Sequence, residues 1–108
     1  MAVIETRKPA AESFRDYELV IIANAELAPE KFDTVLEDIS RRITEKGGSV
    51  AETQHWGKRK LAFPIRHYLE GHYALLKFKS TPAVSRRLSS DLRISEQVIR
   101  HMLINLDT

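Results

Sequence analysis

The 108-residue chain contains no cysteine. This absence excludes disulfide bonds, thiolate zinc sites and cysteine nucleophiles. It also fits a reducing compartment such as the cytoplasm, where disulfides are rare. Long apolar runs are missing too, and none approaches the roughly 20 residues that a membrane-spanning helix needs. The remaining composition, 43% hydrophobic and 30% charged, is that of an ordinary globular protein, and the length predicts one domain.

The first fourteen residues, MAVIETRKPAAESF, lack the continuous apolar segment of a secretory signal. Glu5 and Glu12 argue against a transit peptide, because such peptides contain few acidic residues. We expect residues 1–14 to form a short flexible extension, to which the sequence assigns no role. Residues 15–108 are expected to form the folded domain.

Charge is distributed unevenly along the chain. Residues 1–54 contain seven Lys and Arg against eleven Asp and Glu, whereas residues 55–108 contain ten against four. The two halves nearly cancel, which leaves a formal net charge of +2. A local excess of cations favours a surface that faces a polyanion, but surface cations also serve solubility alone. Charge by itself leaves both interpretations open.

Hydrophobic periodicity predicts four strands and two helices, alternating as strand, helix, strand, strand, helix, strand. The predicted ranges in chain order are 17–25, 29–46, 49–65, 71–79, 82–92 and 97–106, with a turn over 66–70. This order is that of a ferredoxin-like split βαβ fold of the α+β class, in which a four-stranded antiparallel sheet carries both helices on one face. The opposite face of the sheet is then free for partners.

The first predicted helix has the clearest pattern. Pro29 suits its first position, where the N–H that proline lacks would be unpaired anyway. Apolar residues then recur at helical spacing on one face, namely Phe32, Val35, Leu36, Ile39 and Ile43. On the opposite face we expect two ion pairs at i,i+4 spacing, Glu37 with Arg41 and Asp38 with Arg42.

Three adjacent cations, Lys58, Arg59 and Lys60, stand inside the predicted strand over 49–65. Because side chains alternate along a strand, the two lysines share one face and Arg59 points to the other. Gly57 predicts a bulge, which would bring the cluster to the edge of the sheet. There the cations would either anchor phosphates of a nucleic-acid backbone or protect an unpaired edge against aggregation. The residues alone favour neither function.

An aromatic residue and a proline near the cluster are candidates for contact with a protein. Trp56 has the size and amphipathic character of an interface anchor. Pro64 has no N–H to donate, so one side of the strand is predicted to be unpaired there and open to a docking chain. Phe63, which alternates with Leu61 and Ile65, is instead predicted to lie in the core.

The other cations provide further candidates for contact with a polyanion. Arg15 opens the first strand, and Arg93 and Arg100 bracket the turn into the last strand, so we expect these three to lie near one another. Lys77 and Lys79 are predicted on the open face of the sheet and complete the set.

Several segments carry a resemblance to a known family. They are, in chain order, RDYE at 15–18, WGKRKLAFPI at 56–65, GHY at 71–73 and LRISEQVIR at 92–100. Together they resemble the bacterial small-subunit ribosomal protein six family over nearly all of the folded part, and the ten-residue block is the most specific element. The chain departs from the family in its longer N-terminal extension and in its ending without an acidic tail.

The resemblance implies a ferredoxin-like fold and a structural, non-enzymatic role in the cytoplasmic ribosome, without a cofactor. It also implies that the protein binds the central domain of small-subunit ribosomal RNA together with small-subunit ribosomal protein eighteen. RNA then becomes the expected partner of six cations: Arg15, Lys58, Arg59, Lys60, Arg93 and Arg100. The protein partner is expected at Trp56 and Pro64.

Three alternative functions find less support in the sequence. An RNA-recognition motif would need the aromatic pattern of its third strand, and EGHYALLK at 70–77 supplies only the glycine and one aliphatic position. Catalysis finds no support, because the four histidines lack metal-ligand spacing and no catalytic motif occurs. A small ferredoxin-like regulatory or ligand-sensing module without RNA binding would need a ligand pocket, for which the sequence offers no sign.

Overall fold

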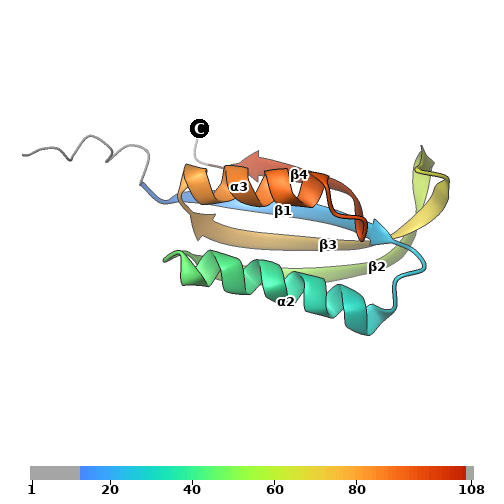
Figure 1. Ribbon diagram of the computed structural model, residues 1–108, viewed down its shortest axis with the longest axis horizontal. Helices are drawn as coiled ribbons and strands as arrows, with labels where there is room; N and C mark the ends of the chain where they lie inside the picture. The colour runs from blue at the N-terminus through green and yellow to red at the C-terminus, as the bar shows by residue number, and fades with distance from the viewer. Residues whose placement is uncertain (1–12, 107–108) are drawn as a thin grey trace, which may run out of the picture.

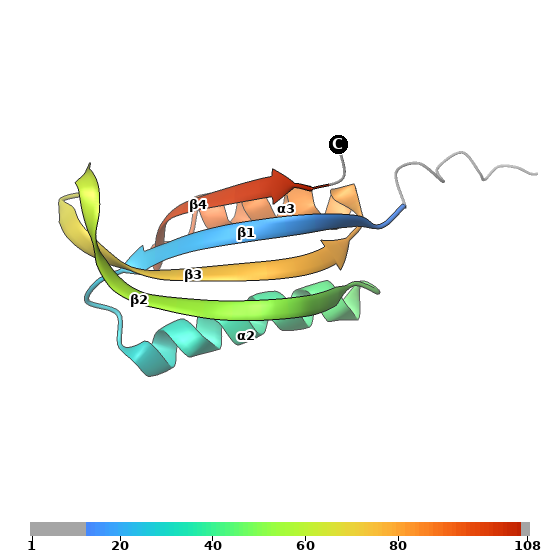
Figure 2. The ribbon, with the colours of Figure 1, turned by 180° about the vertical axis from the view of Figure 1, so that it is seen from behind.

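The computed structural model describes residues 13–106, which form one sheet and two helices (Figure 1). In chain order the elements are β1 (Arg15–Asn24), α2 (Pro29–Glu45), β2 (Ser49–Ile65), β3 (Tyr68–Ser80), α3 (Pro82–Arg93) and β4 (Val98–Asn105). The strands pair antiparallel in the order β2-β3-β1-β4. Both helices cover one face of the sheet, and the view from behind shows the other face without a helix (Figure 2). The predicted ferredoxin-like fold is confirmed. Most of the predicted extension, residues 1–12, lies outside the described residues.

The core lies between the two helices and the covered face of the sheet. Strand β1 is central, has apolar residues on both faces, and supplies the fully buried Leu19 and Ile21. Leu76 of β3 pairs with Leu19 and is equally buried. The helices contribute the apolar stripes that their periodicity predicted, namely Phe32, Leu36, Ile39 and Ile43 from α2 and Leu88 and Leu92 from α3.

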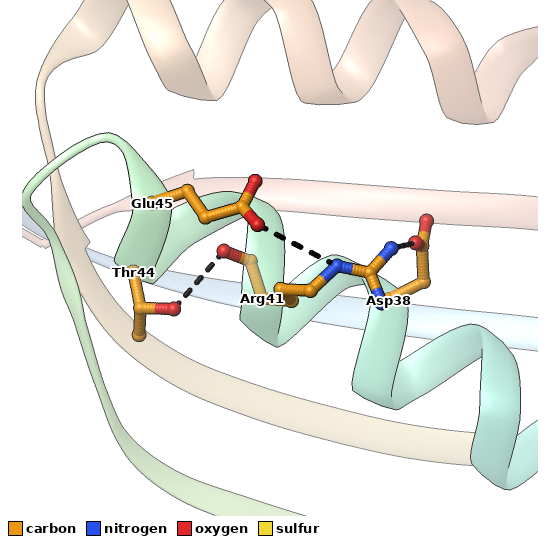
Figure 3. A network of polar contacts seen from close by, with 4 residues as sticks. All are labelled: Asp38, Arg41, Thr44 and Glu45. Atoms are coloured by element: carbon orange, nitrogen blue, oxygen red, sulfur yellow. Dashed lines mark hydrogen bonds and ion pairs between the residues drawn. The ribbon is translucent and has the colours of Figure 1, made fainter.

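Polar contacts on α2 differ from those predicted. Arg41 contacts Asp38 one turn before it and lies 3.8 Å from the Glu45 carboxylate one turn after it (Figure 3). Arg42 reaches across to Asp91 of α3 instead of pairing within its own helix. The predicted pairs Glu37–Arg41 and Asp38–Arg42 are therefore wrong, because α3 supplies a carboxylate that the spacing along α2 does not reveal.

The turn between β2 and β3 is shorter than predicted. Only Arg66 and His67 separate the two strands, and both have positive φ angles, 49° and 73°. Two left-handed residues in a row make the tight turn that suits the twist of a two-stranded ribbon, a role usually given to Asn-Gly. Strand β1 ends at Asn24, opposite Gly71, so the hairpin extends past the rest of the sheet (Figure 1).

The pairing of β2 with β3 shifts register three times, once near the start of β2, between residues 50 and 52, and twice nearer the turn. One of the two shifts nearer the turn falls between His55 and Gly57, where Gly57 has a φ of 84°, as the predicted bulge requires. The second falls between Lys60 and Ile65, so that the four residues 61–64 lie opposite Leu69 alone. The second interruption leaves the outer hairpin, residues 61–69, without a regular ladder of strand pairs.

Phe63 occupies this irregular segment and is 59% exposed. Its predicted position in the core is therefore wrong. The alternation with Leu61 and Ile65 suggested a half-buried strand, but the hairpin has passed the end of β1 and no helix covers it there.

Candidate nucleic-acid interface

The three adjacent cations lie on β2, the edge strand of the sheet. Lys58 and Lys60 pair with residues 72 and 70 of β3 and project to the helix side, whereas Arg59 pairs with Gly71 and projects to the open face. All three side chains are exposed. Among residues 13–106, no ion pair involves any of them. The nearest acids are Glu70, opposite Lys60 in the ladder, and Glu26, which lines the same groove as the two lysines.

Arg59 and Trp56 form one structural unit on the open face. The Arg59 guanidinium lies 5.8 Å from the centroid of the Trp56 ring, and its Nε donates to the Trp56 carbonyl at 3.2 Å. The Trp56 ring stacks on Tyr73 with centroids 6.5 Å apart, and its Nε1 donates to Gln54 at 2.9 Å. Trp56 still exposes 38% of its surface. The candidate RNA contact and the candidate protein contact are therefore adjacent.

The outer hairpin also carries a cluster of exposed apolar side chains. Sequence reasoning singled out Pro64 but missed Leu69 and the exposure of Phe63. Leu69 is 66% exposed, Phe63 is almost as open, and Pro64 is exposed beside them. With Lys58 and Lys60 they line a groove of about 710 Å³ on the helix side of the hairpin. The signal available in the sequence was Pro64, which marks the interrupted pairing and hence a segment that the body of the sheet does not cover.

The remaining arginines do not form one group. Arg15 lies opposite Ser80 and Arg100 lies opposite Ile22, so they occupy the two ends of β1. Seven residues of strand separate these positions, about 23 Å at 3.3 Å per residue. The expectation that Arg15 lies near Arg100 is therefore wrong, because antiparallel pairing brings the start of β4 to the end of β1. Arg93, the last residue of α3, lies at the Arg100 end.

Lys77 and Lys79 differ from the edge cluster in having acidic neighbours. The Lys77 ammonium lies 3.8 Å from Glu18 and 3.9 Å from Glu52, and Lys79 lies 3.8 Å from Asp16. These pairs cross three adjacent strands of the open face. Because their charge is locally neutralised, we no longer count these lysines among the candidate RNA contacts.

Titration and metal chemistry add little to this site. His101, whose pKa is shifted, lies on β4, away from the hairpin. Burial, followed by the nearby charge of Arg93, lowers the pKa of His101 below its ordinary value of 6.5. Within residues 13–106, no cluster of acidic or histidine side chains is arranged to hold a metal ion, and neither helix is long and apolar enough to cross a membrane.

Comparison with known proteins gives a consistent set of relatives. The family model described as Ribosomal protein S6 matches residues 16–105. A small ribosomal subunit protein bS6 of Dehalococcoides mccartyi strain CBDB1 is 53% identical over 107 residues, covering 99% of this chain and 98% of that protein. The bS6 protein of Moorella thermoacetica is 40% identical over 93 residues, covering 86% of this chain and 95% of its own.

A solved structure is similar as well. The crystal structure of 30S ribosomal protein S6 from Thermotoga maritima superposes with a TM-score of 0.79 at 23% identity. The match covers 86% of this chain and 88% of that one. At this identity the similarity establishes the shared fold.

Proposed function

The chain belongs to the ribosomal protein S6 family, and from this membership we propose that it binds small-subunit ribosomal RNA through its β2–β3 hairpin, beside a second protein. As a member of this family it is a structural, non-enzymatic protein of the small subunit of the cytoplasmic ribosome. The family assignment and the absence of enzymatic function expected from the sequence are both confirmed.

The observation that carries the RNA proposal is the cluster of three exposed cations on the edge strand β2, none of which forms an ion pair among the described residues. Lys58 and Lys60 provide point charges on one side of the edge, and Arg59 provides a guanidinium on the other. Cations on both sides of a strand edge can bind phosphate groups that lie on the two sides of that edge. Such contacts fix the position of a protein on RNA without reading its sequence. Arg100 lies at the same end of the sheet and is proposed to add to this surface, whereas Arg15, at the far end, is proposed as a separate contact.

The proposed protein partner is small-subunit ribosomal protein eighteen, as the family resemblance implies, and the proposed RNA target is the central domain. Trp56 and Pro64 remain the proposed contacts, now joined by Phe63 and Leu69. Phe63, Pro64 and Leu69 line a groove beside two lysines, and Trp56 is exposed outside it. Exposed apolar side chains of this size are typical anchors of protein interfaces. Because Trp56 contacts Arg59, a proposed protein contact and a proposed RNA contact adjoin on the open face of β2.

A salt titration tests the RNA proposal. The variant Lys58→Ala/Arg59→Ala/Lys60→Ala is compared with wild type for binding to a transcript of the central domain, in the presence of small-subunit ribosomal protein eighteen. The slope of log K against log salt should fall by about two to three, since each lost phosphate contact removes somewhat less than one.

The control is Lys77→Ala/Lys79→Ala, which removes two ion-paired lysines from the open face and should leave the slope unchanged. A triple variant with the wild-type slope would contradict the proposal. Sedimentation of the triple variant without RNA addresses the other function of edge cations, because self-association on their removal would reveal protection of the β2 edge.

A further inference from the structure

Helix α3 has two polar faces with different electrostatic environments. On the face toward α2, Arg87 lies 3.6 Å from Asp91, which also contacts Arg42. On another face, Arg86 and Arg93 stand two helical turns apart, and neither takes part in an ion pair among the described residues. The single carboxylate of α3 therefore serves one face and leaves the other cationic.

The cationic face of α3 borders a groove against β4. The groove has a volume of about 680 Å³, and its lining includes Arg86, Ser90, Arg93 and His101. Ser89 Oγ lies 2.7 Å from His101 Nε2 and joins the two walls by a hydrogen bond. The groove thus combines two guanidinium groups with hydroxyl and imidazole groups, all of which can bind a phosphate oxygen.

No acidic side chain balances this groove within the described residues. Strand β4, VIRHMLIN, contains no carboxylate, and His101 pairs across the sheet with the apolar Ile21 of β1. Glu96, in the loop after α3, forms no ion pair in the described part of the chain, and Asp91 lies on the other side of the helix. Arg93 is also close enough to lower the pKa of His101, although burial contributes more.

We propose that the groove between α3 and β4 is a second binding site for the RNA phosphate backbone. Arg86 and Arg93 are separated by about 10.5 Å along the helix axis, at 1.5 Å per residue, a span that accommodates nearby phosphates of one strand. Planar guanidinium groups bind phosphate in a bidentate manner. This inference rests on the proposed function, because it assigns a further surface to the same partner.

The groove lies on a different part of the protein surface from the hairpin. It lies along β4, at the opposite edge of the sheet from the hairpin on β2. Three strand spacings of about 4.8 Å separate these edges. The two sites therefore lie at opposite edges of the sheet and hold two different segments of RNA backbone, so the protein joins them.

Charge variants test the second site on the full-length protein. Arg86→Gln/Arg93→Gln should lower the slope of log K against log salt by about 1.5 for the central-domain transcript with small-subunit ribosomal protein eighteen present. Arg87→Gln is the control, because it removes one arginine charge from the same helix but from the ion-paired face, and it should leave the slope unchanged. A double variant that behaves like this control would overturn the second site.

Crosslinking locates the contact directly and uses the absence of cysteine, since a single introduced cysteine carries the only label. A photoreactive group is attached at Ser90→Cys in the groove, Ala62→Cys in the hairpin, or Glu37→Cys on α2 as a control. RNA crosslinks from the first two and none from the third are expected.

The outcomes separate the two proposals. Crosslinks to RNA from Ala62→Cys but not from Ser90→Cys would overturn the second site and leave the proposed function intact. Crosslinks from Ser90→Cys to protein in place of RNA would overturn it as well. No RNA crosslink from either position, together with no binding by wild type, would refute both.

Discussion

Individual side chains acquire different roles from their surroundings even when the sequence makes them look alike. Arg59 sits between two lysines, yet it alone is held, by the Trp56 ring and carbonyl. Arg87 follows Arg86 directly, yet only Arg87 has a carboxylate partner in the described residues. Position on the strand or helix, more than residue type, decides which cations are free to bind an external anion.

His101 supports a prediction about pH. Burial and then Arg93 lower its pKa in the folded protein, so the unfolded chain binds more protons near the ordinary pKa of 6.5. The contribution of His101 to the free energy of unfolding should therefore be fully present above that pH. It should be lost as the pH falls through the folded-state pKa. Urea unfolding from pH 5 to 8 measures this decline.

The comparison variant for this prediction is His101→Gln, which cannot titrate. Contributions of the other three histidines are common to both proteins and cancel in the difference. Wild type should lose more stability on acidification than the variant. Parallel curves would show that the surroundings of His101 do not disfavour its charged form.

At the scale of elements, the β2–β3 hairpin differs most from regular structure. Its turn places Arg66 and His67 in the left-handed region, which costs roughly 1 kcal/mol or more for each residue with a Cβ. Its outer strand also bulges over residues 61–64. The hairpin therefore retains local strain at the point where the exposed apolar side chains gather.

Replacing the turn residues should relieve this strain. Arg66→Asn/His67→Gly introduces the pair that tight hairpin turns prefer, and we expect the free energy of unfolding to rise by about 1–2 kcal/mol. Chemical denaturation provides the measurement. Arg66→Ala/His67→Ala is the control, since it removes the same side chains without easing the backbone. Equal free energies of unfolding for the two variants would contradict the inference that the turn is strained.

Some elements were predictable from the sequence because their determinants are local. Pro29 and the apolar stripe located α2, and Gly57 located a bulge. Other features depend on contacts between distant segments. Arg42 pairs with Asp91 across two helices, and Phe63 is exposed because β1 ends before the hairpin does. Neither fact is present in the local pattern that surrounds the residue.

The whole molecule consists of a compact body and a hairpin that extends beyond it (Figure 1). The body has a continuous core between sheet and helices, and its central strand is paired on both sides. The outer hairpin has exposed apolar side chains and irregular pairing instead. Stability should differ between the two parts, because local opening depends on packing and regular hydrogen bonding.

Hydrogen exchange measures this difference. Backbone amides of residues 60–69 should exchange faster than those of β1 in the isolated protein. Addition of small-subunit ribosomal protein eighteen should slow exchange in the hairpin and leave β1 unchanged, because the proposed partner covers the former. Uniform protection before addition, or no slowing after it, would count against the hairpin as the docking surface.

The sheet order also governs when the newly synthesised chain can fold. Strand β1 is made first, but its neighbours β3 and β4 come from the second half of the chain, and β4 ends at Asn105. Contacts between such distant segments form late and slowly. The chain must therefore be translated through β4 before its central strand gains its second neighbour, so the sheet cannot be completed until that strand has been made.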